Sequence, residues 1–453
     1  MGRFFGTDGV RGVANQHPIT PEIALNLGRA AAAVLKHNHH STVVIAKDGR
    51  KSGDMIEAAL AAGICSAGAD VLLAGMLPTP AVAFLVRHAR ADAGIMVSAS
   101  HNPFEDNGIK LFDATGFKLD SATEEQIEAR ILNTSPEIHL AAAPEAIGRV
   151  YPMPEAADQY AGFLKKSLGR KDLLKGMKIV LDCANGATSE IAPQVFANLG
   201  ADLTVLFNSP NGTNINDGCG SQHIETLQQA VLENRADLGC AFDGDGDRLI
   251  AVDETGSAVT GDQILAICAR HLKQAGRLKN NLAVSTVMSN LGLRLALKEM
   301  DIEHRITDVG DRYVLDEMRK SGAIIGGEDS GHMIFLDAHT SGDGILTALH
   351  LIEAMDASNS RLSGLCRIMR RYPQVLKNVR IREKTDIYQI PAIAGKIEKV
   401  KTHLGEQGRV LVRYSGTQPL CRIMVEGPDE EETDELCQQI VDVIAAELNG
   451  SLE

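Results

Sequence analysis

Residues 238–248, LGCAFDGDGDR, join a continuous apolar run directly to three aspartates that alternate with glycines. The same change from apolar to polar residues occurs at two other places. One is AGIMVSASHNP (93–103), and the other is AIIGGEDSGH (323–332). Strands that are apolar throughout are typical of parallel sheets covered on both faces, and ligands bind beyond the carboxyl ends of such strands. The three loops are therefore the first candidates for a functional site.

Each of these runs is the last strand of a repeated β-α-β-α-β pattern. Apolar residues at helical spacing separate the expected strands, as in DMIEAALAAGICSAG (54–68). The earlier strands of the three repeats are TVVIAKD (42–48) and VLLAG (71–75), KIVLDCANG (178–186) and LTVLF (203–207), and LAVSTVMS (282–289) and HRITDVG (304–310).

The C-terminal part of the chain has a different pattern. VLVRYS (410–415) and CRIMVEG (421–427) are expected to be strands, residues 429–448 one amphipathic helix, and residues 370–378 a linker. The sequence thus predicts an α/β fold: three similar α/β domains with mainly parallel mixed sheets, plus a C-terminal α+β domain, around a central cleft. The expected domain ranges are 1–150, 151–253, 254–370 and 371–453.

Composition narrows the range of functions. The 453 residues carry 45 basic and 59 acidic side chains, a formal charge of −14, which disfavours binding to nucleic acid. No apolar run reaches the roughly 18 residues of a membrane span, and charged residues near the start argue against a signal peptide. The eight cysteines are scattered, so we expect buried thiols in a reducing cytoplasm rather than disulfides or a zinc cluster.

The aspartates of the central loop favour a metal site. Asp243, Asp245 and Asp247 alternate along an extended segment, so their carboxylates point the same way and repel one another. A bound divalent cation is the natural compensation. An EF-hand loop is rejected, because Arg248 stands where that loop requires glycine.

The other two polar loops allow two interpretations each. Ser100, in S-A-S-H-N-P, could give and take a phosphoryl group, although a simple turn explains the same residues. Glu328, Ser330 and His332 could bind a hydroxyl-rich ligand such as a sugar, or the segment could cap a helix.

Several cations could bind phosphate. The segment R-Y-S-G-T-Q-P-L-C-R (413–422) combines two arginines with hydroxyls and a glycine, which suits an anion nest as well as it suits an exposed hairpin. Arg11 and Lys110 could each pair with phosphate, but taken singly they are better explained as ordinary surface charges. Together, however, the loops contain a nucleophile, a metal triad, a hydroxyl-binding set and a phosphate nest, in order along the chain. That combination suits the movement of phosphate on a sugar.

These residues resemble the α-D-phosphohexomutase family over almost the whole chain. Within the family, MGRFFGTDGVRG (1–12), V-G-D-R-Y-V (309–314) and G-G-E-D-S-G-H (326–332) look like the bacterial subgroup that acts on glucosamine phosphates. The resemblance implies a phosphoserine at Ser100. It also implies Mg²⁺ bound by Asp243, Asp245, Asp247 and the phosphate on Ser100.

The resemblance implies roles for the remaining residues as well. Lys110 and His332 match acid/base residues, Arg11 and Arg248 lie near the serine and the metal, and Glu328 and Ser330 match the sugar-contacting loop. The residues that match the loop for the distal phosphate are Arg413, Ser415, Gly416, Thr417 and Arg422. Gln418 and Asp329 depart from the usual pattern, in which Glu and Gln respectively are expected.

The expected reaction interconverts glucosamine 6-phosphate and glucosamine 1-phosphate, with a hexosamine 1,6-bisphosphate as intermediate and activator. We expect a cytoplasmic enzyme that acts on a small phosphosugar, without nucleic-acid or membrane partners, and that is able to form a homodimer. The alternatives are a phosphoglucomutase or phosphomannomutase, a silent sugar-phosphate binder, and a phosphatase.

Overall fold

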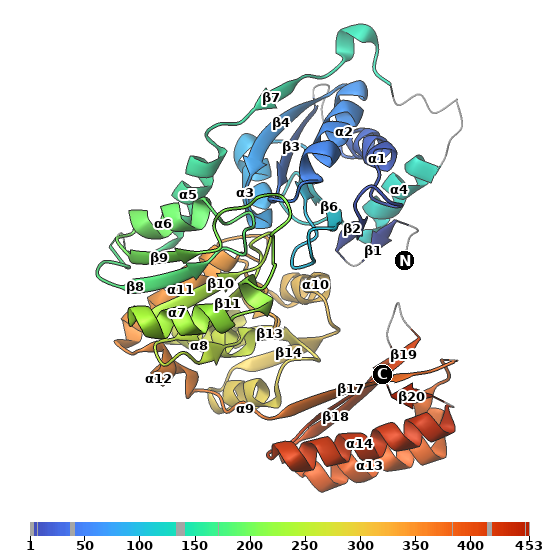
Figure 1. The fold of residues 1–453 in the computed structure, drawn as a ribbon, viewed down its shortest axis with the longest axis vertical. Helices are drawn as coiled ribbons and strands as arrows, with labels where there is room; N and C mark the ends of the chain where they lie inside the picture. The colour runs from blue at the N-terminus through green and yellow to red at the C-terminus, as the bar shows by residue number, and fades with distance from the viewer. Residues whose placement is uncertain are drawn as a thin grey trace. The chain divides into compact units, whose positions relative to one another are not determined.

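The three apolar runs form equivalent strands of three sheets. The computed structural model describes residues 4–6, 8–36, 41–132, 141–170, 172–382, 384–414, 419–448 and 450–452. In it, the runs are β5 (Ala93–Val97), β10 (Leu238–Phe242) and β15 (Ile325–Gly327). In each repeat, the first strand lies between the second and the third, and both pairings are parallel. The predicted repeat and the mainly parallel mixed sheets are confirmed (Figure 1).

The first sheet has the order β1-β2-β6-β5-β3-β4-β7. Its other strands are β1 (Phe5–Gly6), β2 (Gly9–Val13), β3 (Ser41–Lys47), β4 (Ala69–Met76), β6 (Asp106–Asp113) and β7 (Val150–Pro152). Side chains of α1 (Pro21–Val34) and α2 (Gly53–Ser66) share one apolar core with alternate residues of the strands, such as Val43 and Ile45. The other face of the sheet packs on α3 (Thr79–Ala89). Both faces are therefore covered, as apolar strands require.

The second and third sheets repeat this plan with fewer strands, in the orders β12-β11-β10-β8-β9 and β14-β13-β15-β16. Their other strands are β8 (Lys178–Asp182), β9 (Asp202–Leu206), β11 (Leu249–Asp253), β12 (Ala258–Val259), β13 (Leu282–Thr286), β14 (Glu303–Thr307) and β16 (Met333–Phe335). The helices that accompany these two sheets are α5 (Ala156–Ser167), α6 (Ile191–Asn198), α7 (Glu225–Asn234), α8 (Gly261–Gln274), α10 (Asp311–Ser321), α11 (Gly344–Ser358) and α12 (Leu362–Cys366). Helix α4 (Ser121–Leu132) packs on α1 beside the first sheet, and α9 (Leu291–Glu299) groups with residues 368–453.

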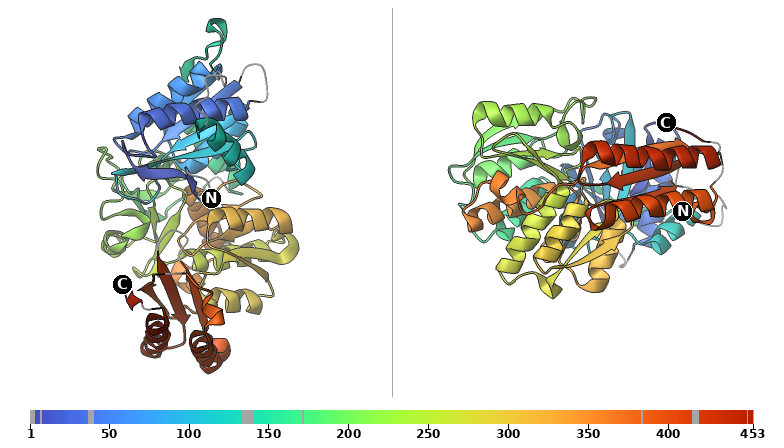
Figure 2. Two further views of the ribbon diagram at one scale, coloured as in Figure 1. Left: turned by 90° about the vertical axis from the view of Figure 1, so that its right-hand side faces the viewer. Right: turned by 90° about the horizontal axis from the view of Figure 1, so that it is seen from below.

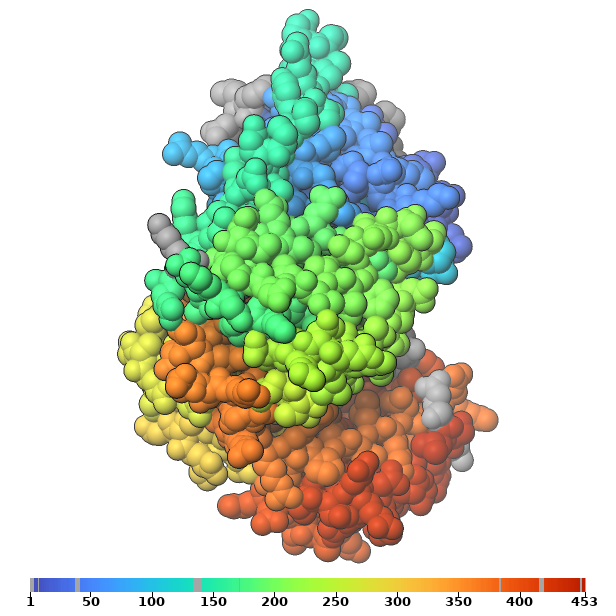
Figure 3. Space-filling view, turned by 60° about the vertical axis from the view of Figure 1, so that its left-hand side comes forward, coloured from blue at the N-terminus to red at the C-terminus, as the bar shows by residue number. Residues whose placement is uncertain are grey.

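The chain divides into two compact units. The first contains residues 1–288 and 302–367, and the second contains residues 289–301 and 368–453. Within the first unit, the chain around η1 (Pro144–Ala146) forms a projection before β7 (Figure 3). Six of the eight cysteines are buried, as expected from their scattered positions. No helix in the described part of the chain is long and apolar enough to cross a membrane.

The second unit contains the predicted α+β arrangement. Its sheet has the order β18-β19-β17-β20, formed by β18 (Arg409–Tyr414), β19 (Leu420–Glu426), β17 (Gln374–Arg380) and β20 (Ser451–Leu452). Helices α13 (Pro391–Leu404) and α14 (Glu430–Glu447) lie side by side on one face (Figure 2). Asp429 caps α14 by accepting a hydrogen bond from Glu432 N. The expected linker at 370–378 is wrong in its second half, because Gln374 to Asn378 pair with β19.

Candidate active site

The nucleophile candidate Ser100 lies in a tight loop beyond the carboxyl end of β5. Its φ is +55°, and its carbonyl oxygen accepts hydrogen bonds from Arg50 Nη2 at 2.8 Å and from Asn216 Nδ2 at 2.9 Å. Residues other than glycine rarely adopt this left-handed backbone conformation, so the two hydrogen bonds hold a strained residue in place. The loop that carries the aspartates comes close here. A Cβ added at Gly244 would be 2.6 Å from the Ser100 carbonyl oxygen, so only glycine fits that position.

The Ser100 hydroxyl points at the aspartate loop. Its Oγ donates to Asp243 Oδ2 at 2.6 Å, and Ser100 is only 1% exposed. His101 Nδ1 lies 3.3 Å from Ser100 Oγ. Burial, and then the positive charges of Arg248 and Arg11, lower the pKa of His101 to about 4, so its ring is neutral near pH 7. Ser100 and the aspartate loop, which are far apart in sequence, are thus in direct contact.

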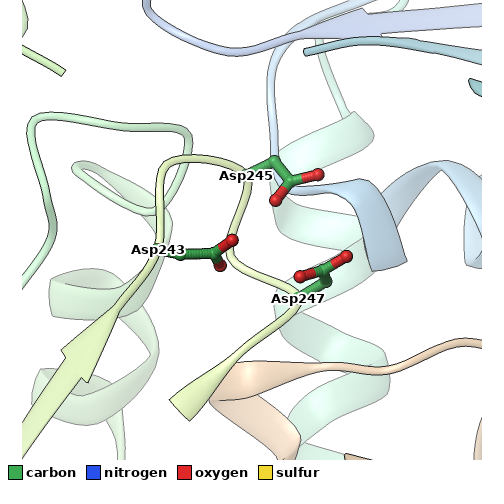
Figure 4. A group of neighbouring side chains, drawn as sticks. All are labelled: Asp243, Asp245 and Asp247. Atoms are coloured by element: carbon green, nitrogen blue, oxygen red, sulfur yellow. The ribbon is translucent and has the colours of Figure 1, made fainter. Parts of the chain in front are cut away.

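The three aspartates gather around one point. They follow β10 in a loop, and one carboxylate oxygen from each lies within 4.8 Å of the others (Figure 4). All three side chains are nearly or fully buried. Burial, followed by repulsion from Asp247 and Asp245, raises the pKa of Asp243 well above its usual value. Packing three carboxylates in this way is costly unless a positive charge compensates them.

The donor set fits a hard divalent cation. Among the residues that the structure describes, the buried oxygens Asp245 Oδ1 and Asp247 Oδ1 have no hydrogen-bond partner. Carboxylate oxygens are the ligands that Mg²⁺ and Ca²⁺ prefer. Two buried oxygens without partners, next to the Ser100 hydroxyl, leave coordination positions that a cation could use.

Lys110 supplies part of the positive charge that compensates the buried aspartates. It lies on β6 and is 1% exposed, with its Nζ 2.6 Å from Asp245 Oδ2, 3.4 Å from Asp247 Oδ2 and 3.2 Å from Asp8 Oδ2. Burial alone would lower the pKa of Lys110, but the carboxylates outweigh burial and raise it above its usual value. Burial would likewise raise the pKa of Asp245, but Lys110 holds it below its usual value.

The loop that carries Glu328, Ser330 and His332 joins the same site through an isolated β-bridge. Arg248, directly after the aspartates, forms an isolated antiparallel bridge with His332, and its backbone N donates to Asp243 Oδ1 at 3.2 Å. His332 Nε2 lies 3.9 Å from Asp247 Oδ2. Within the described ranges, neither ring nitrogen of this buried histidine has a hydrogen-bond partner. His332 also lines a pocket of about 220 Å³.

The other predicted residues occupy different positions. Glu328 is half-buried, and its Oε1 accepts a hydrogen bond from Gly310 N at 3.0 Å, whereas Ser330 is exposed. Arg11, on β2, forms an ion pair with Asp8. Arg413 and Arg422 belong to the second unit, where they are directly opposite each other on β18 and β19. Ser415, Gly416 and Thr417, as well as Gln418, lie outside the described residues.

Some residues at the site were not singled out from the sequence. Asp8 contacts Lys110, Arg11 and Lys118, and Lys118 also contacts Asp311 at the start of α10. Asp8 lies in MGRFFGTDGVRG (1–12) and Asp311 in VGDRYV (309–314), but nothing local distinguishes them from surface charges. Only the fold brings them together.

Comparison with known proteins agrees with this geometry. The sequence models of the four domains of the phosphoglucomutase/phosphomannomutase family match the chain in order. They are alpha/beta/alpha domain I at residues 2–137, domain II at 158–256, domain III at 260–372, and the C-terminal domain at 376–443. The chain belongs to this family. The resemblance to the phosphohexomutases is therefore confirmed.

Relatives and solved structures of the family extend over the whole chain. The phosphoglucosamine mutase of Syntrophus aciditrophicus (strain SB) is 54% identical over 449 residues, which cover 99% of this chain and 100% of that protein. A phosphoglucomutase/phosphomannomutase family protein from Burkholderia thailandensis has a TM-score of 0.79 at 24% identity, covering 97% of this chain and 96% of that one. The N-acetylphosphoglucosamine mutase of Aspergillus fumigatus, solved with GlcNAc-6P and magnesium, has a TM-score of 0.67 at 18% identity, covering 99% and 96%.

Proposed function

We propose that this chain interconverts glucosamine 6-phosphate and glucosamine 1-phosphate, through a phosphoserine at Ser100 and a bisphosphate intermediate. The phosphoglucosamine mutase that is 54% identical over the full length supports this choice of substrate within the family. The observation that carries the mechanism is the contact between the Ser100 hydroxyl and Asp243, inside a buried cluster of three carboxylates. The product would serve amino-sugar nucleotide and cell-wall precursor synthesis.

Two phosphoryl transfers make up the reaction. In the first, the bond between Ser100 Oγ and phosphorus breaks while O1 of glucosamine 6-phosphate attacks and loses its proton, and Ser100 Oγ gains a proton. The resulting 1,6-bisphosphate then reverses its orientation in the site. In the second, the O6–phosphorus bond breaks while Ser100 Oγ attacks and loses its proton, and O6 gains a proton. The number of phosphates on the enzyme is restored, so the net reaction is an isomerisation. An in-line transfer of this kind depends mainly on positioning and on charge stabilisation.

Asp243, Asp245 and Asp247, with an oxygen of the phosphate on Ser100, would hold Mg²⁺. A bound Mg²⁺ supplies neutralisation of charge on the phosphoryl group as it moves. The chain itself contributes Lys110 and Arg248, whose cationic groups lie 2.6 Å from Asp245 and 3.8 Å from Asp247. Arg11 adds a further positive charge next to Asp8.

Lys110 and His332 are proposed as the groups that assist proton transfer. The carboxylates around Lys110 keep it charged, so its ammonium group can donate a hydrogen bond to the leaving oxygen as negative charge develops there. His332 has ring nitrogens without hydrogen-bond partners in the described part of the structure, so either nitrogen can accept a proton from a sugar hydroxyl. Glu328 and Ser330, on the same loop, would contact the sugar.

Arg413 and Arg422 would hold the phosphate that is not reacting, together with Ser415, Gly416 and Thr417. The two arginines are directly opposite on antiparallel strands. Like charges in this position repel, and an anion bound between them would offset the repulsion. The bisphosphate activator, a cytoplasmic location and a homodimer stay predictions.

The test compares the wild-type chain with S100A on the 6-phosphates of glucosamine, glucose and mannose, with Mg²⁺ and a trace of the matching bisphosphate. We expect turnover of glucosamine 6-phosphate, and we expect S100A to lose roughly 10³-fold or more of it because alanine has no oxygen to carry the phosphoryl group. Intact-mass measurement should find phosphate on the wild-type chain and none on S100A.

Each other outcome points to a different function. A preference for glucose or mannose 6-phosphate would keep the mechanism and replace the substrate. Release of inorganic phosphate without isomerisation would indicate a phosphatase. Binding without turnover or covalent phosphate would indicate a silent binder, and substantial turnover by S100A would refute the phosphoserine.

A further inference from the structure

A row of charged contacts joins helix α10 to the first sheet. Asp311 forms an ion pair with Lys118, which follows β6. Next to it, Arg312 Nη2 contacts Glu124 Oε1 at 2.7 Å and donates to the Leu119 carbonyl at 2.9 Å. About two helical turns further along the same face of α10, the Arg319 guanidinium lies 4.5 Å from the centre of the Phe117 ring. We call these contacts the α10 seam.

Only one pair in the α10 seam continues into the candidate active site. Lys118 contacts Asp8 as well as Asp311, and Asp8 lies 3.2 Å from Lys110 Nζ. Lys110 in turn contacts Asp245 of the metal triad at 2.6 Å. The Lys118–Asp311 pair is therefore the outer end of a continuous chain of charges that reaches the aspartate loop.

The same pair is connected to the sugar-binding candidates. Asp311 Oδ2 lies 3.8 Å from His332 Nε2. Gly310, directly before Asp311, donates its backbone N–H to Glu328 Oε1 at 3.0 Å. The start of α10 thus touches the loop that carries Glu328 and His332 on one side, and Lys118 on the other.

Burial makes this chain of charges sensitive to the loss of any member. The side chains of Lys118 and Asp311 are 15% and 17% exposed. Asp8 is shared by three cations, Lys110, Lys118 and Arg11. Removing one partner of such a largely buried pair leaves an uncompensated charge, which the neighbouring groups relieve by moving. The neighbours here are the proposed proton-transfer groups, and small shifts of such groups are costly for catalysis.

We propose that Lys118 and Asp311 are positioning residues of the phosphoryl-transfer site, which hold His332 and Glu328 at a fixed distance from Ser100 and the aspartate loop. This inference rests on the proposed function. Neither residue touches the reacting atoms; both act through Asp8, Lys110 and His332. The Arg312–Glu124 pair of the α10 seam also begins on α10 but ends on α4, and it makes no contact that continues to the aspartates, so it only fastens the helix.

The experiment compares K118M, D311N and K118M/D311N with the matched control E124Q, all in the full-length chain. Steady-state kinetics with glucosamine 6-phosphate should show kcat lower by roughly tenfold or more in both single variants, with KM changed by less than about threefold. E124Q should keep kcat within about twofold while lowering the melting temperature. Because the two residues act as one pair, the double variant should be little worse than the worse single variant.

Two further variants separate positioning from stability. K118R keeps a cation between Asp8 and Asp311 and should restore most of the activity. The charge swap K118D/D311K should not, because it leaves Asp8 facing a carboxylate. If K118M does not fold, D311N and K118R still decide the question. Equal losses of kcat in D311N and E124Q, or rescue by the charge swap, would overturn the inference. Failure of the wild-type chain to turn over any phosphosugar would instead overturn the proposed function, and the inference with it.

Discussion

At the scale of single residues, the buried imidazole of His339 makes stability depend on pH. His339 is 1% exposed, and its Nε2 lies 2.9 Å from the Pro80 carbonyl oxygen, which can only accept, so Nε2 carries the proton. Burial lowers its pKa to about 4. Between that value and an unfolded value of about 6.5, the unfolded chain binds a proton that the folded chain does not. Stability should therefore fall as pH falls through this range, by about 2 kcal/mol at pH 5.

The variant H339Q isolates this effect, because glutamine keeps a donor for the Pro80 carbonyl but does not titrate. Thermal unfolding at pH 7.5 and at pH 5 should show a larger loss of melting temperature in the wild-type chain than in H339Q. Asp343, whose pKa burial raises to about 7, acts in the opposite direction in both proteins and cancels in the comparison. Equal losses in the two proteins would show that another group controls the acid sensitivity.

At the scale of secondary-structure elements, glycines within helices should respond to substitution in opposite ways. Gly63 lies where α2 crosses α1, and a Cβ there would be 2.1 Å from the Leu25 carbonyl oxygen. Gly162, in α5, has nothing within 4 Å of the equivalent position. G63A should push the two helices apart and destabilise the fold by about 2 kcal/mol or more. G162A should stabilise it by about 0.5–1 kcal/mol, since alanine loses less backbone entropy.

Melting temperatures of the two variants test this difference. A G63A protein as stable as the wild type would mean that the α1–α2 crossing adjusts without cost. A G162A protein that is less stable would mean that the exposed face of α5 has a further constraint.

The elements of the fold were predictable where the signal is local. The buried strand β10 is apolar throughout and β3 is apolar in its centre, and Ser100 and the three aspartates stand in compact motifs at strand ends. Contacts between residues that are far apart in the sequence have no such local signal. Asp8, Lys118 and Asp311 are far apart in sequence and resemble surface charges until the fold buries them together. Residues 374–378 are Gln-Val-Leu-Lys-Asn directly after Pro373 and lack the alternation of polar and apolar residues that marks a strand, so the sequence predicts a linker where β17 begins.

At the scale of the whole molecule, one buried carboxylate joins distant segments of the second unit. Glu426, at the end of β19, accepts hydrogen bonds from Leu291 N at 3.1 Å and from Asn290 Nδ2 at 3.2 Å. It thereby ties the start of α9 to the C-terminal sheet, so residues 289–301 fold with residues 368–453 rather than with their sequence neighbours. Glu426 is the last residue of a strand-forming run and gives no sign of this role in the sequence. The two units can therefore be followed separately in solution.

Mg²⁺ should stabilise the first unit alone, because the aspartate triad lies entirely within it. A ligand at about 100 times its dissociation constant adds about 2.7 kcal/mol to the unit that binds it. Hydrogen exchange followed by mass spectrometry should show slower exchange in peptides of β10 and β11 when Mg²⁺ is added, and no change in peptides of β17 and β19. The matched variant is D243N. The raised pKa of Asp243 favours its neutral form without the ion, so asparagine should preserve the metal-free stability and abolish the response to Mg²⁺. A response that persists in D243N would place the cation elsewhere, and a response in the second unit would show that binding is not confined to the triad.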